Sequence, residues 1–424
     1  MRYGLIGGKL GHSFSKDIHE QLGAPGYELR ELLPEEVEGF LAKREFRGIN
    51  VTIPYKETVI PFLDEVSERA RAIGAVNTIV NDGGRLIGDN TDFGGMAMLL
   101  RKTGIEIEDR KVLILGSGGT SKTARAVARE LGAASINRVS RTKRDDCITY
   151  EEAASEHTDA DVIINTTPVG MYPNNDAQPL ELASFPKLSG VMDAIYNPLR
   201  SRLVLEAQKR QIPAAGGLYM LVAQAVYAAA RFRTVCDADD YRGIGSGTEQ
   251  EIAAATERIF RKMITEKQSV VLTGMPGVGK TTVGRIVAER LGREFVDCDE
   301  EIVRRSGCDI PTIFAERGEK GFRDLEAAVI RELTSQGGRV IATGGGAILR
   351  ADNVANLKSN GCVVFLDRPL DSIAVAPGRP LSTDRETLTA RYRERYPIYC
   401  ATCDVHIEGD AKAEEIAERV LRAL

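Results

Sequence analysis

A glycine-rich turn between an apolar run and an amphipathic segment constrains the fold of this 424-residue chain more than any other feature. The turn, residues 274–282, has the sequence GMPGVGKTT, and the apolar run SVVLT precedes it. The apolar residues that follow it have the spacing of one helical face: Val283, Ile286, Val287 and Leu291. A strand, a tight turn and a helix in this order are typical of a parallel α/β sheet, so we expect such a sheet here.

The same turn has the pattern G-x-x-x-x-G-K-[ST], which binds phosphate. The pattern is filled by Gly274, Gly279, Lys280 and Thr281. Backbone N–H groups and the helix N-terminus would hold the β-phosphate of a nucleotide. Lys280 would bridge the terminal phosphates of ATP, and Thr281 would ligate Mg²⁺. We assign Gly277 and Thr282 to the same nucleotide-binding loop.

Two acidic residues, Asp297 and Asp299, follow in the segment FVDCDEEI, at alternate positions of an expected strand end. Carboxylates at alternate positions point the same way. One can serve the metal, and the other can accept a hydrogen bond from a hydroxyl nucleophile. The pattern also fits an acidic cap of the next helix, at Asp299 or Glu300.

Residues further along would suit an anionic acceptor. They are Arg323 in GEKGFRDLE, a motif that also contains Glu326, then Gly344, Gly345 and Gly346 at the end of the strand RVIATGGGAIL, and Arg395 in RYRERYPIY. Bare glycines let a small acceptor lie against the backbone. Two guanidinium groups could clamp a carboxylate bidentately. For either arginine alone, a solvated surface position is the alternative.

Five motifs in this order resemble shikimate kinase: the phosphate loop, F-x-D-x-D, G-E-x-x-F-R-x-x-E, the triple glycine and R-x-P-x-Y. The resemblance covers residues 268–424 and implies that Asp299 contacts the ring hydroxyls of shikimate and is the candidate base. Asp297, with Thr281, is then assigned to the metal. The resemblance also implies that the two arginines and three glycines complete the acceptor site, and that Arg379 belongs to a lid over ATP. That lid usually has a further arginine upstream, which SIAVAPGRPLS lacks, so a weaker grip on phosphate is expected.

A second strand–turn–helix unit occupies residues 111–132, KVLILGSGGTSKTARAVARELG. One face of its helix carries Ala124, Val127, Ala128 and Leu131. Its loop consists of Gly116, Ser117, Gly118 and Gly119. A glycine loop in this position is typical of a Rossmann dinucleotide-binding unit.

The next strand favours NADP over NAD. It is SINRVSRTKR, residues 135–144, and it has no carboxylate before Asp145. An NAD site would place an acidic residue here for the ribose hydroxyls, whereas basic side chains suit a 2′-phosphate. Strand alternation leaves open whether Arg138 or Arg141 faces the nucleotide.

Three polar residues upstream could carry proton transfer. Lys56 in GINVTIPYKE, Asn77 in GAVNTIV and Asp92 in GDNTDFGG each lie at the end of a glycine-bounded strand. Reduction of a carbonyl needs an acid within hydrogen-bond reach as the hydride arrives, and Lys56 with Asp92 could provide it. The sequence leaves open whether these residues meet.

Residues 2–232 resemble shikimate dehydrogenase, through these stretches together with HSFSKDIH, INTTPVGMYP, DAIYNPLRSRL and GGLYMLVAQA. The resemblance implies that Lys56 is catalytic and that Arg141 binds the 2′-phosphate. It also implies a set of residues that bind the ring and carboxylate: Ser13, Ser15, Thr52, Asn77, Asp92, Tyr196 and Gln224. Lys16 departs from the family, which normally has proline after the S-x-S motif.

Composition limits the setting of the protein. A net charge of -5 argues against non-specific nucleic-acid binding. No apolar run approaches the ~20 residues that span a bilayer, and the N-terminus reaches glycine too early for a signal peptide. Seven cysteines fit a reducing cytoplasm better than a disulfide framework. The expected partners are therefore small molecules, without nucleic acid or membrane.

The polar stretch CDADDYRGIGSGTEQE, residues 236–251, is expected to be a surface linker that ends in a capping box at Thr248 and Glu251. We expect the following organisation: a substrate lobe in 1–98 with a returning helix in 217–232, a Rossmann NADP lobe in 99–216, a linker and helix in 233–267, and a P-loop domain of the nucleoside-monophosphate-kinase type in 268–424.

These inferences combine into one hypothesis, a bifunctional enzyme of the shikimate pathway. NADPH would reduce 3-dehydroshikimate to shikimate, and ATP with Mg²⁺ would phosphorylate the 3-hydroxyl of shikimate. In one alternative, one half is a non-catalytic binding module. Because the lid over ATP lacks the further arginine, the kinase is the half expected to have lost its activity under this alternative. In others, the dehydrogenase prefers quinate with NAD, or the kinase acts on another small polyol. The pattern Ser-Arg-x-Lys at residues 140–143 disfavours NAD.

Overall fold

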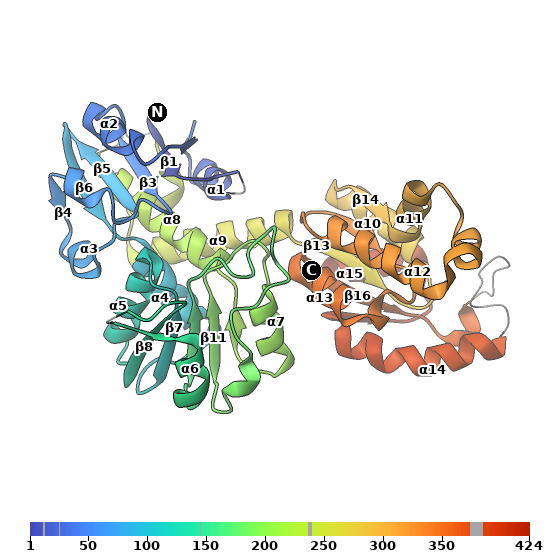
Figure 1. The fold of residues 1–424 in the computed structure, drawn as a ribbon. Coiled ribbons are helices and arrows are strands. Elements are labelled where there is room, and N and C mark those ends of the chain that lie inside the picture. The colour runs from blue at the N-terminus through green and yellow to red at the C-terminus, as the bar shows by residue number, and fades with distance from the viewer. Residues whose placement is uncertain (12, 25, 145, 236–239, 374–384) are drawn as a thin grey trace. The chain divides into compact units, whose positions relative to one another are not determined.

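The computed structural model describes the chain apart from residues 12, 25, 145, 236–239 and 374–384 (Figure 1). It divides into two compact units, Met1–Lys262 and Met263–Leu424, and the division falls inside helix α9 (Glu249–Lys267). Both units are α/β structures with parallel strands, which confirms the predicted fold class. Within the described ranges, no helix has the length and apolar character needed to cross a membrane.

The first sheet of unit 1 is mixed, with the strand order β2-β1-β3-β5-β6-β4. Its strands are β1 (Tyr3–Gly7), β2 (Glu28–Glu31), β3 (Gly48–Val51), β4 (Glu65–Val66), β5 (Thr78–Asp82) and β6 (Arg85–Asp89). Strand β1 is parallel to β2 and β3, whereas β5 is antiparallel to β3 and β6. The helices of this first lobe are α1 (Ser15–Gln21), α2 (Glu36–Lys43), α3 (Glu68–Ile73) and the 3₁₀ turn Ile60–Phe62.

The second sheet of unit 1 is parallel throughout, with the order β12-β11-β10-β7-β8-β9. Its strands are β7 (Lys111–Leu115), β8 (Ser135–Ser140), β9 (Cys147–Thr149), β10 (Val162–Asn165), β11 (Gly190–Asp193) and β12 (Ala214–Ala215). The helices of this second lobe are α5 (Gly119–Glu130), α6 (Tyr150–Glu156), α7 (Arg202–Lys209) and the 3₁₀ turn Leu182–Ser184. On α5, the predicted apolar face is buried at Ala124, Val127 and Ala128.

Two helices connect the lobes of unit 1. Helix α4 (Asp92–Thr103) leads from the first sheet to the second, and α8 (Leu218–Phe232) returns and packs against α4, α1 and β5. The contact between α4 and α8 is close, because a Cβ at Gly95 would lie 2.7 Å from the carbonyl oxygen of Met220. Figure 1 shows α4 and α8 at the junction of the two sheets.

The segment after α8 differs from the predicted surface linker. Tyr241 is fully buried, and its hydroxyl lies 3.1 Å from His19 Nδ1. Asp240 is also buried, accepts a hydrogen bond of 3.1 Å from the Tyr3 hydroxyl and pairs with Arg2 at 2.7 Å. The prediction is wrong at Asp240, Tyr241 and Ile244, which are buried because an aromatic ring in a polar stretch can still pack into a core; Arg242, 245–246 and 248–250 are exposed, as predicted. The 3₁₀ turn Arg242–Ile244 follows.

Helix α9 begins as predicted. Thr248 Oγ1 accepts the Glu251 amide at 3.3 Å, and Glu251 Oε2 accepts the Thr248 amide at 3.1 Å, which confirms the capping box. Its apolar stripe is buried: Ile252, Ala255, Ile259 and Met263. Glu257 fixes the helix to unit 1, since it pairs with Lys102 at 2.6 Å and accepts from the Tyr219 hydroxyl at 3.0 Å.

Unit 2 contains one parallel sheet, with the order β14-β15-β13-β16-β17. Its strands are β13 (Ser269–Thr273), β14 (Phe295–Asp297), β15 (Val340–Ala342), β16 (Gly361–Asp367) and β17 (Val405–Glu408). Its helices are α10 (Lys280–Leu291), α11 (Cys298–Ser306), α12 (Ile310–Leu333), α13 (Ala351–Asn360), α14 (Arg385–Thr402) and α15 (Ala413–Ala423), with 3₁₀ turns at Ala347–Leu349 and Leu370–Ser372. Ligands of open α/β sheets bind beyond the carboxyl ends of the strands where the strand order reverses, and β13 lies at that point.

Unit 1 should lose stability in acid because of His19. Its ring is fully buried and stacks on Tyr27, with ring centroids 4.1 Å apart. Burial lowers the pKa of His19 to about 3 from 6.5. Below pH 6.5 the imidazole therefore binds a proton in the unfolded chain but not in the folded chain. The contribution of His19 to the free energy of unfolding is complete above pH 6.5 and is lost as the pH falls below that value. At pH 5 we expect a free energy of unfolding lower by about 2 kcal/mol.

Pulse proteolysis across a urea series at pH 7.5 and 5.0 measures this difference for unit 1. His19→Phe keeps an aromatic ring against Tyr27 but cannot titrate, so its loss on acidification should be smaller by that amount. Equal losses in the two proteins would contradict the assignment.

Two candidate active sites

The first site lies in unit 1 around an ion pair between Lys56 and Asp92. Lys56 follows strand β3, and Asp92 is the first residue of α4. Lys56 Nζ lies 2.6 Å from Asp92 Oδ2, and the two side chains are only 13% and 7% exposed. Such burial strengthens the attraction, because little water screens it. The sequence left open whether Lys56 and Asp92 meet, and the structure shows that they do. Their ion pair fixes one ammonium group beyond the carboxyl end of strand β3.

Two amides complete this cluster. Asn77 Nδ2 donates to Asp92 Oδ1 at 2.9 Å and lies 3.3 Å from Gln224 Oε1. Asn77 Oδ1 accepts the Thr91 amide at 2.7 Å. The structure thus brings Lys56, Asn77 and Asp92 together and adds Gln224 from α8. Amide and carboxylate oxygens beside an ammonium group suit a ligand with several hydroxyls.

A second group of predicted residues gathers at the start of α1. Ser13 Oγ accepts the Ser15 amide at 3.2 Å, and the rings of Phe14 and Tyr196 lie 5.2 Å apart. Burial raises the pKa of Tyr196, against the opposite effect of its hydrogen bond with Ser13. Thr52 lies at the end of β3, where its amide donates to the Ile6 carbonyl at 3.0 Å. In the described part of the chain its side chain makes no hydrogen bond with either group.

The predicted dinucleotide loop, residues 116–119, lies beside the ion pair. Gly116 has a φ of 117°, in the region that favours glycine. A Cβ at Gly119 would lie 3.3 Å from the Cβ of Lys56. Thr120 Oγ1 is 3.5 Å from Lys56 Nζ. The N-terminus of α5 and the ammonium group therefore share one small region, where a cofactor and a carbonyl substrate could meet.

The structure separates the roles of Arg138 and Arg141. Arg138 is 6% exposed, and its guanidinium donates to Ser121 Oγ at 3.0 Å and to the Ser117 carbonyl at 2.8 Å, and also bonds Asp146. These hydrogen bonds hold the dinucleotide loop and the start of α5 in place. Arg141 directly follows the end of β8 and is exposed, so of the two arginines it is the one whose side chain faces solvent.

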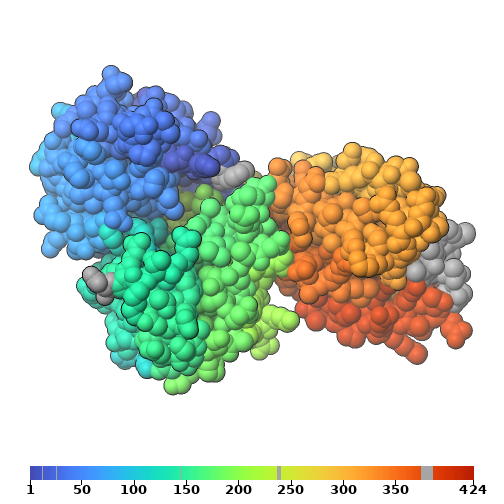
Figure 2. Space-filling view, viewed as in Figure 1, coloured from blue at the N-terminus to red at the C-terminus, as the bar shows by residue number. Residues whose placement is uncertain are grey.

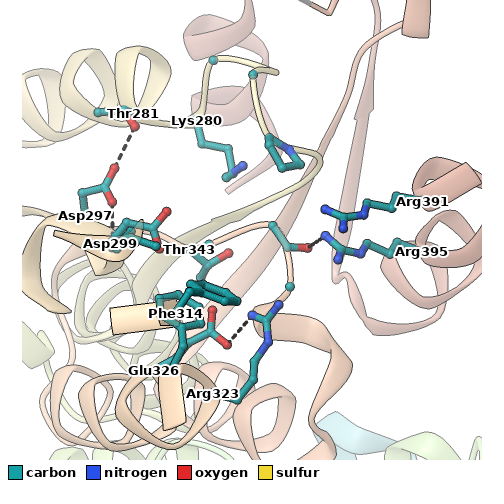
Figure 3. A pocket seen from close by; sticks show the side chains of 18 of the residues that line it. Lys280, Thr281, Asp297, Asp299, Phe314, Arg323, Glu326, Thr343, Arg391 and Arg395 are labelled. Carbon is teal, nitrogen blue, oxygen red and sulfur yellow. Dashed lines mark hydrogen bonds and ion pairs between the residues drawn. The ribbon is translucent and has the colours of Figure 1, made fainter. Parts of the chain in front are cut away.

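The second site lies in unit 2 at the turn after β13. Gly274, Gly277 and Gly279 have φ values of 144°, 90° and 95°, which only glycine adopts readily. Lys280 Nζ lies 2.9 Å from the Gly274 carbonyl and 3.0 Å from that of Met275. The turn thus has the cradle form that its sequence predicted, with its lysine folded over it (Figure 3).

Asp297 joins this turn to helix α11. Its Oδ2 accepts a hydrogen bond of 2.7 Å from Thr281 Oγ1, and its Oδ1 accepts the Asp299 amide at 3.0 Å. The acidic cap of α11 is therefore Asp297, and the alternative of a cap at Asp299 or Glu300 is wrong. Asp299 instead lines the cavity, as Figure 3 shows.

A cavity of about 470 Å³ opens between these elements. Predicted residues that line it are Gly277, Gly279, Lys280, Thr281, Thr282, Asp297, Asp299, Arg323, Gly344, Gly345, Gly346 and Arg395. The glycines let the wall approach charged groups, because a Cβ at Gly344 would lie 2.9 Å from both Asp299 Oδ1 and Glu326 Oε1. Arg379 lies outside the described residues.

A buried carboxylate holds Arg323 in this cavity. Arg323 Nη1 donates to Glu326 Oε2 at 2.9 Å, and Glu326 is fully buried. Burial raises the pKa of Glu326, while Arg323 acts in the opposite direction. Glu326 Oε1 has no hydrogen-bond partner among the described residues and lies toward the cavity wall. Arg395 lines the same cavity, and its Nη1 donates to the Gly345 carbonyl at 3.2 Å.

Sequence reasoning gave no role to Glu326, although it stands three residues after Arg323, the spacing of an ion pair on one helical face. It also gave none to Arg391, four residues before Arg395, which lines the same cavity. The periodicity of α14 was the signal that could have found it.

Comparison with known proteins assigns both units. Residues 5–79 match the family model described as shikimate dehydrogenase substrate binding domain. A shikimate dehydrogenase (NADP(+)) from Clostridium beijerinckii is 37% identical over an alignment of 245 residues, and the match covers 53% of this chain and 89% of that protein. The chain belongs to the shikimate dehydrogenase family. Shikimate dehydrogenase 1 from Peptoclostridium difficile, a solved structure, is 30% identical with a TM-score of 0.54 and covers 62% of this chain and 99% of its own.

The second unit has its own match. A solved shikimate kinase from Acinetobacter baumannii is 40% identical and covers 38% of this chain and 95% of its own, with a TM-score of 0.37. Residues 276–424 match the family model described as shikimate kinase. The chain therefore joins a shikimate dehydrogenase domain to a shikimate kinase domain, and both predicted resemblances are confirmed.

Gly346→Ala tests the close approach of the wall to Arg323. The new Cβ would lie 2.3 Å from Arg323 Nη2, so the guanidinium must move. We expect the KM for shikimate in the kinase reaction to rise at least about tenfold, since a hydrogen bond to a charged group contributes about 1.5–3 kcal/mol. Steady-state kinetics measure it, and the dehydrogenase reaction of the same variant is the internal control. An unchanged KM would show that Arg323 does not hold the acceptor.

Proposed function

We propose that this chain reduces 3-dehydroshikimate to shikimate with NADPH, and then phosphorylates the 3-hydroxyl of shikimate with ATP. The observation that carries the proposal is that each unit has its own complete constellation. Unit 1 has a buried ammonium–carboxylate pair beside a dinucleotide loop, and unit 2 has an acidic pair and two arginines that line one cavity together with a phosphate loop. The product of the first reaction is the acceptor of the second, on the route to chorismate and the aromatic amino acids.

In unit 1, Lys56 would give a proton to the carbonyl oxygen that becomes a hydroxyl. NADPH supplies the hydride when bound. Asp92 holds the ammonium group in place through their 2.6 Å ion pair, and it can accept a hydrogen bond from a ring hydroxyl. Asn77, Gln224 and Thr52 suit the remaining ring hydroxyls. The hydroxyls of Ser13, Ser15 and Tyr196 suit the carboxylate, because a carboxylate only accepts hydrogen bonds.

The residues of the second lobe fit NADPH. The N-terminus of α5 and the loop Gly116, Ser117, Gly118 and Gly119 present backbone N–H groups for a pyrophosphate, and a Cβ at Gly118 would meet nothing within 4 Å. Arg141 and Lys143 would pair with the 2′-phosphate, which NAD lacks. The name of the Clostridium relative specifies NADP(+), in agreement with this assignment.

In unit 2, Asp299 would accept the proton of the attacking hydroxyl, while Arg323 and Arg395 hold the carboxylate of the acceptor. Thr281 and Asp297, 2.7 Å apart, would hold Mg²⁺, which neutralises phosphate charge when bound. Among the described residues, no three or more His, Cys, Asp or Glu side chains are arranged so that they could hold a metal ion by themselves. Mg²⁺ suits such a sparse site, because it binds through one or two protein groups together with phosphates and water.

We assign four functional segments to the chain on this basis: a substrate lobe in 1–98 completed by the returning helix in 217–232, an NADP lobe in 99–216, a connection in 233–267, and a kinase domain in 268–424. We place the protein in the cytoplasm. In support, the cysteines of the described residues are all free thiols, which suits a reducing compartment.

Two variants should separate the two activities. Lys56→Met should lower NADPH oxidation with 3-dehydroshikimate by about 10²–10⁴, the contribution of a positioned acid, and leave phosphorylation of added shikimate unchanged. Asp299→Ala should do the reverse. NADPH absorbance and a coupled assay of ADP release measure the two rates.

The controls are Lys43→Met and Asp352→Ala, two exposed positions that should leave both rates unchanged. With all substrates present, the wild-type protein should form shikimate 3-phosphate. Accumulation of shikimate alone would confine activity to unit 1 and overturn the kinase half of the proposal.

Arg141→Ala tests the cofactor assignment separately. Because the exposed guanidinium would contact only the 2′-phosphate, the KM for NADPH should rise by about tenfold or more while the KM for NADH stays the same. The comparison of both cofactors under saturating 3-dehydroshikimate measures this. A parallel rise for both cofactors would indicate a role other than phosphate recognition.

A further inference from the structure

Arg391 is a third arginine in the kinase cavity. It lies on α14, one helical turn before Arg395, and both side chains line the cavity together with Arg323 and Lys280. Figure 3 shows the side chains of Arg391 and Arg395 extending in the same direction, and the dashed line from Arg395 marks its hydrogen bond to the Gly345 carbonyl. In that view Arg391 is on the side of Arg395 nearer the phosphate loop, and Arg323 is on the other side.

The three arginines differ in what holds them. Arg323 pairs with Glu326 at 2.9 Å and with Glu319 at 3.4 Å, and Arg395 donates to a backbone carbonyl at 3.2 Å. Arg391 makes no ion pair or hydrogen bond within the part of the chain that the structure describes. It is half-buried, and its pKa is lowered by that burial and by the like charge of Arg395. An anion placed next to Arg391 would relieve this repulsion.

The charge of the cavity indicates which kind of anion is needed. The described residues that line it include four cations, Lys280, Arg323, Arg391 and Arg395, and three carboxylates, Asp297, Asp299 and Glu326. Without Arg391 these lining charges would cancel, although a carboxylate and several phosphates must enter together. Arg323 and Arg395 already provide the two guanidinium groups that one carboxylate can use. Arg391 is therefore in excess of what the carboxylate requires.

We propose that Arg391 is a catalytic residue that donates hydrogen bonds to the phosphoryl group while it moves from ATP to the acceptor hydroxyl. This inference rests on the kinase function proposed above. As the bond from the γ-phosphorus to the bridging oxygen of ATP breaks, the bond to the acceptor oxygen forms, and the hydroxyl proton passes to Asp299. Charge spreads over the phosphoryl oxygens in transit, and a fixed guanidinium beside them lowers the barrier.

Arg391→Met tests the assignment, with Arg393→Met as the matched control. Arg393 is an exposed arginine on the same helix and does not line the cavity. In Arg391→Met we expect kcat of phosphorylation to fall on the order of 10²-fold, the usual effect of removing one donor to a transition state. The KM for shikimate should change less than about threefold, and Arg393→Met should match the wild type. Arg391→Lys, which keeps the charge but not the planar fork, should fall between them.

A binding measurement separates this role from ground-state binding. Aluminium fluoride with MgADP and shikimate mimics the phosphoryl group in transit. Titration calorimetry should show that Arg391→Met binds MgADP and shikimate as the wild type does but loses the tighter binding that fluoride confers. A rise of the KM for shikimate with kcat unchanged would place Arg391 on the carboxylate and overturn the proposal. Wild-type kinetics in Arg391→Met would also overturn it.

Failure of the proposed function gives a different result. In that case the wild-type protein itself would not phosphorylate shikimate, whatever residue stands at position 391. The dehydrogenase rate of each variant, measured on the same preparation, shows that unit 1 is folded, and wild-type binding of MgADP and shikimate shows the same for unit 2.

Discussion

The binding of anions by a chain of net negative charge is the constraint on which both sites depend. The net charge is -5, so no general positive field draws the ligands in, and each cation must be placed individually. Buried carboxylates hold these cations in position, because a buried charge without a partner is energetically costly. Asp92 fixes Lys56, and Glu326 fixes Arg323. Each cation is thus oriented before a ligand arrives, which reduces the reorganisation needed during the reaction.

Features that depend on local sequence were predictable. The phosphate loop requires a strand, glycines with positive φ and a helix within about twenty residues, and all three are specified locally. The capping box at Thr248 and Glu251 and the apolar stripes of α5 and α9 follow from helical spacing in the same way. Arg323 and Arg395, which we propose hold the acceptor, come from distant segments, and only the order of five motifs connected them.

Features that depend on tertiary contacts were not predictable. Alternation along β8 could not distinguish Arg138 from Arg141, because the difference arises from Ser117 and Ser121 on the neighbouring loop and helix. The cap of α11 is a strand residue, Asp297, whose second oxygen is held by Thr281. From residue propensities alone, Arg138 and Asp297 could not be told apart from ordinary charged positions. Their roles become visible only when the sheet brings the chain segments together.

The buried position of Tyr241 limits where the chain can be cut to separate its two domains. Its ring contacts Tyr3 and Phe232, with centroid distances of 5.1 Å and 5.7 Å, and closes the core around His19. A stand-alone reductase cut after residue 232 would leave these aromatic groups facing water and remove a partner of the buried imidazole. Tyr241 is thus part of the hydrophobic interior of unit 1. A separate reductase would therefore have to extend beyond Tyr241 to keep this aromatic cluster intact.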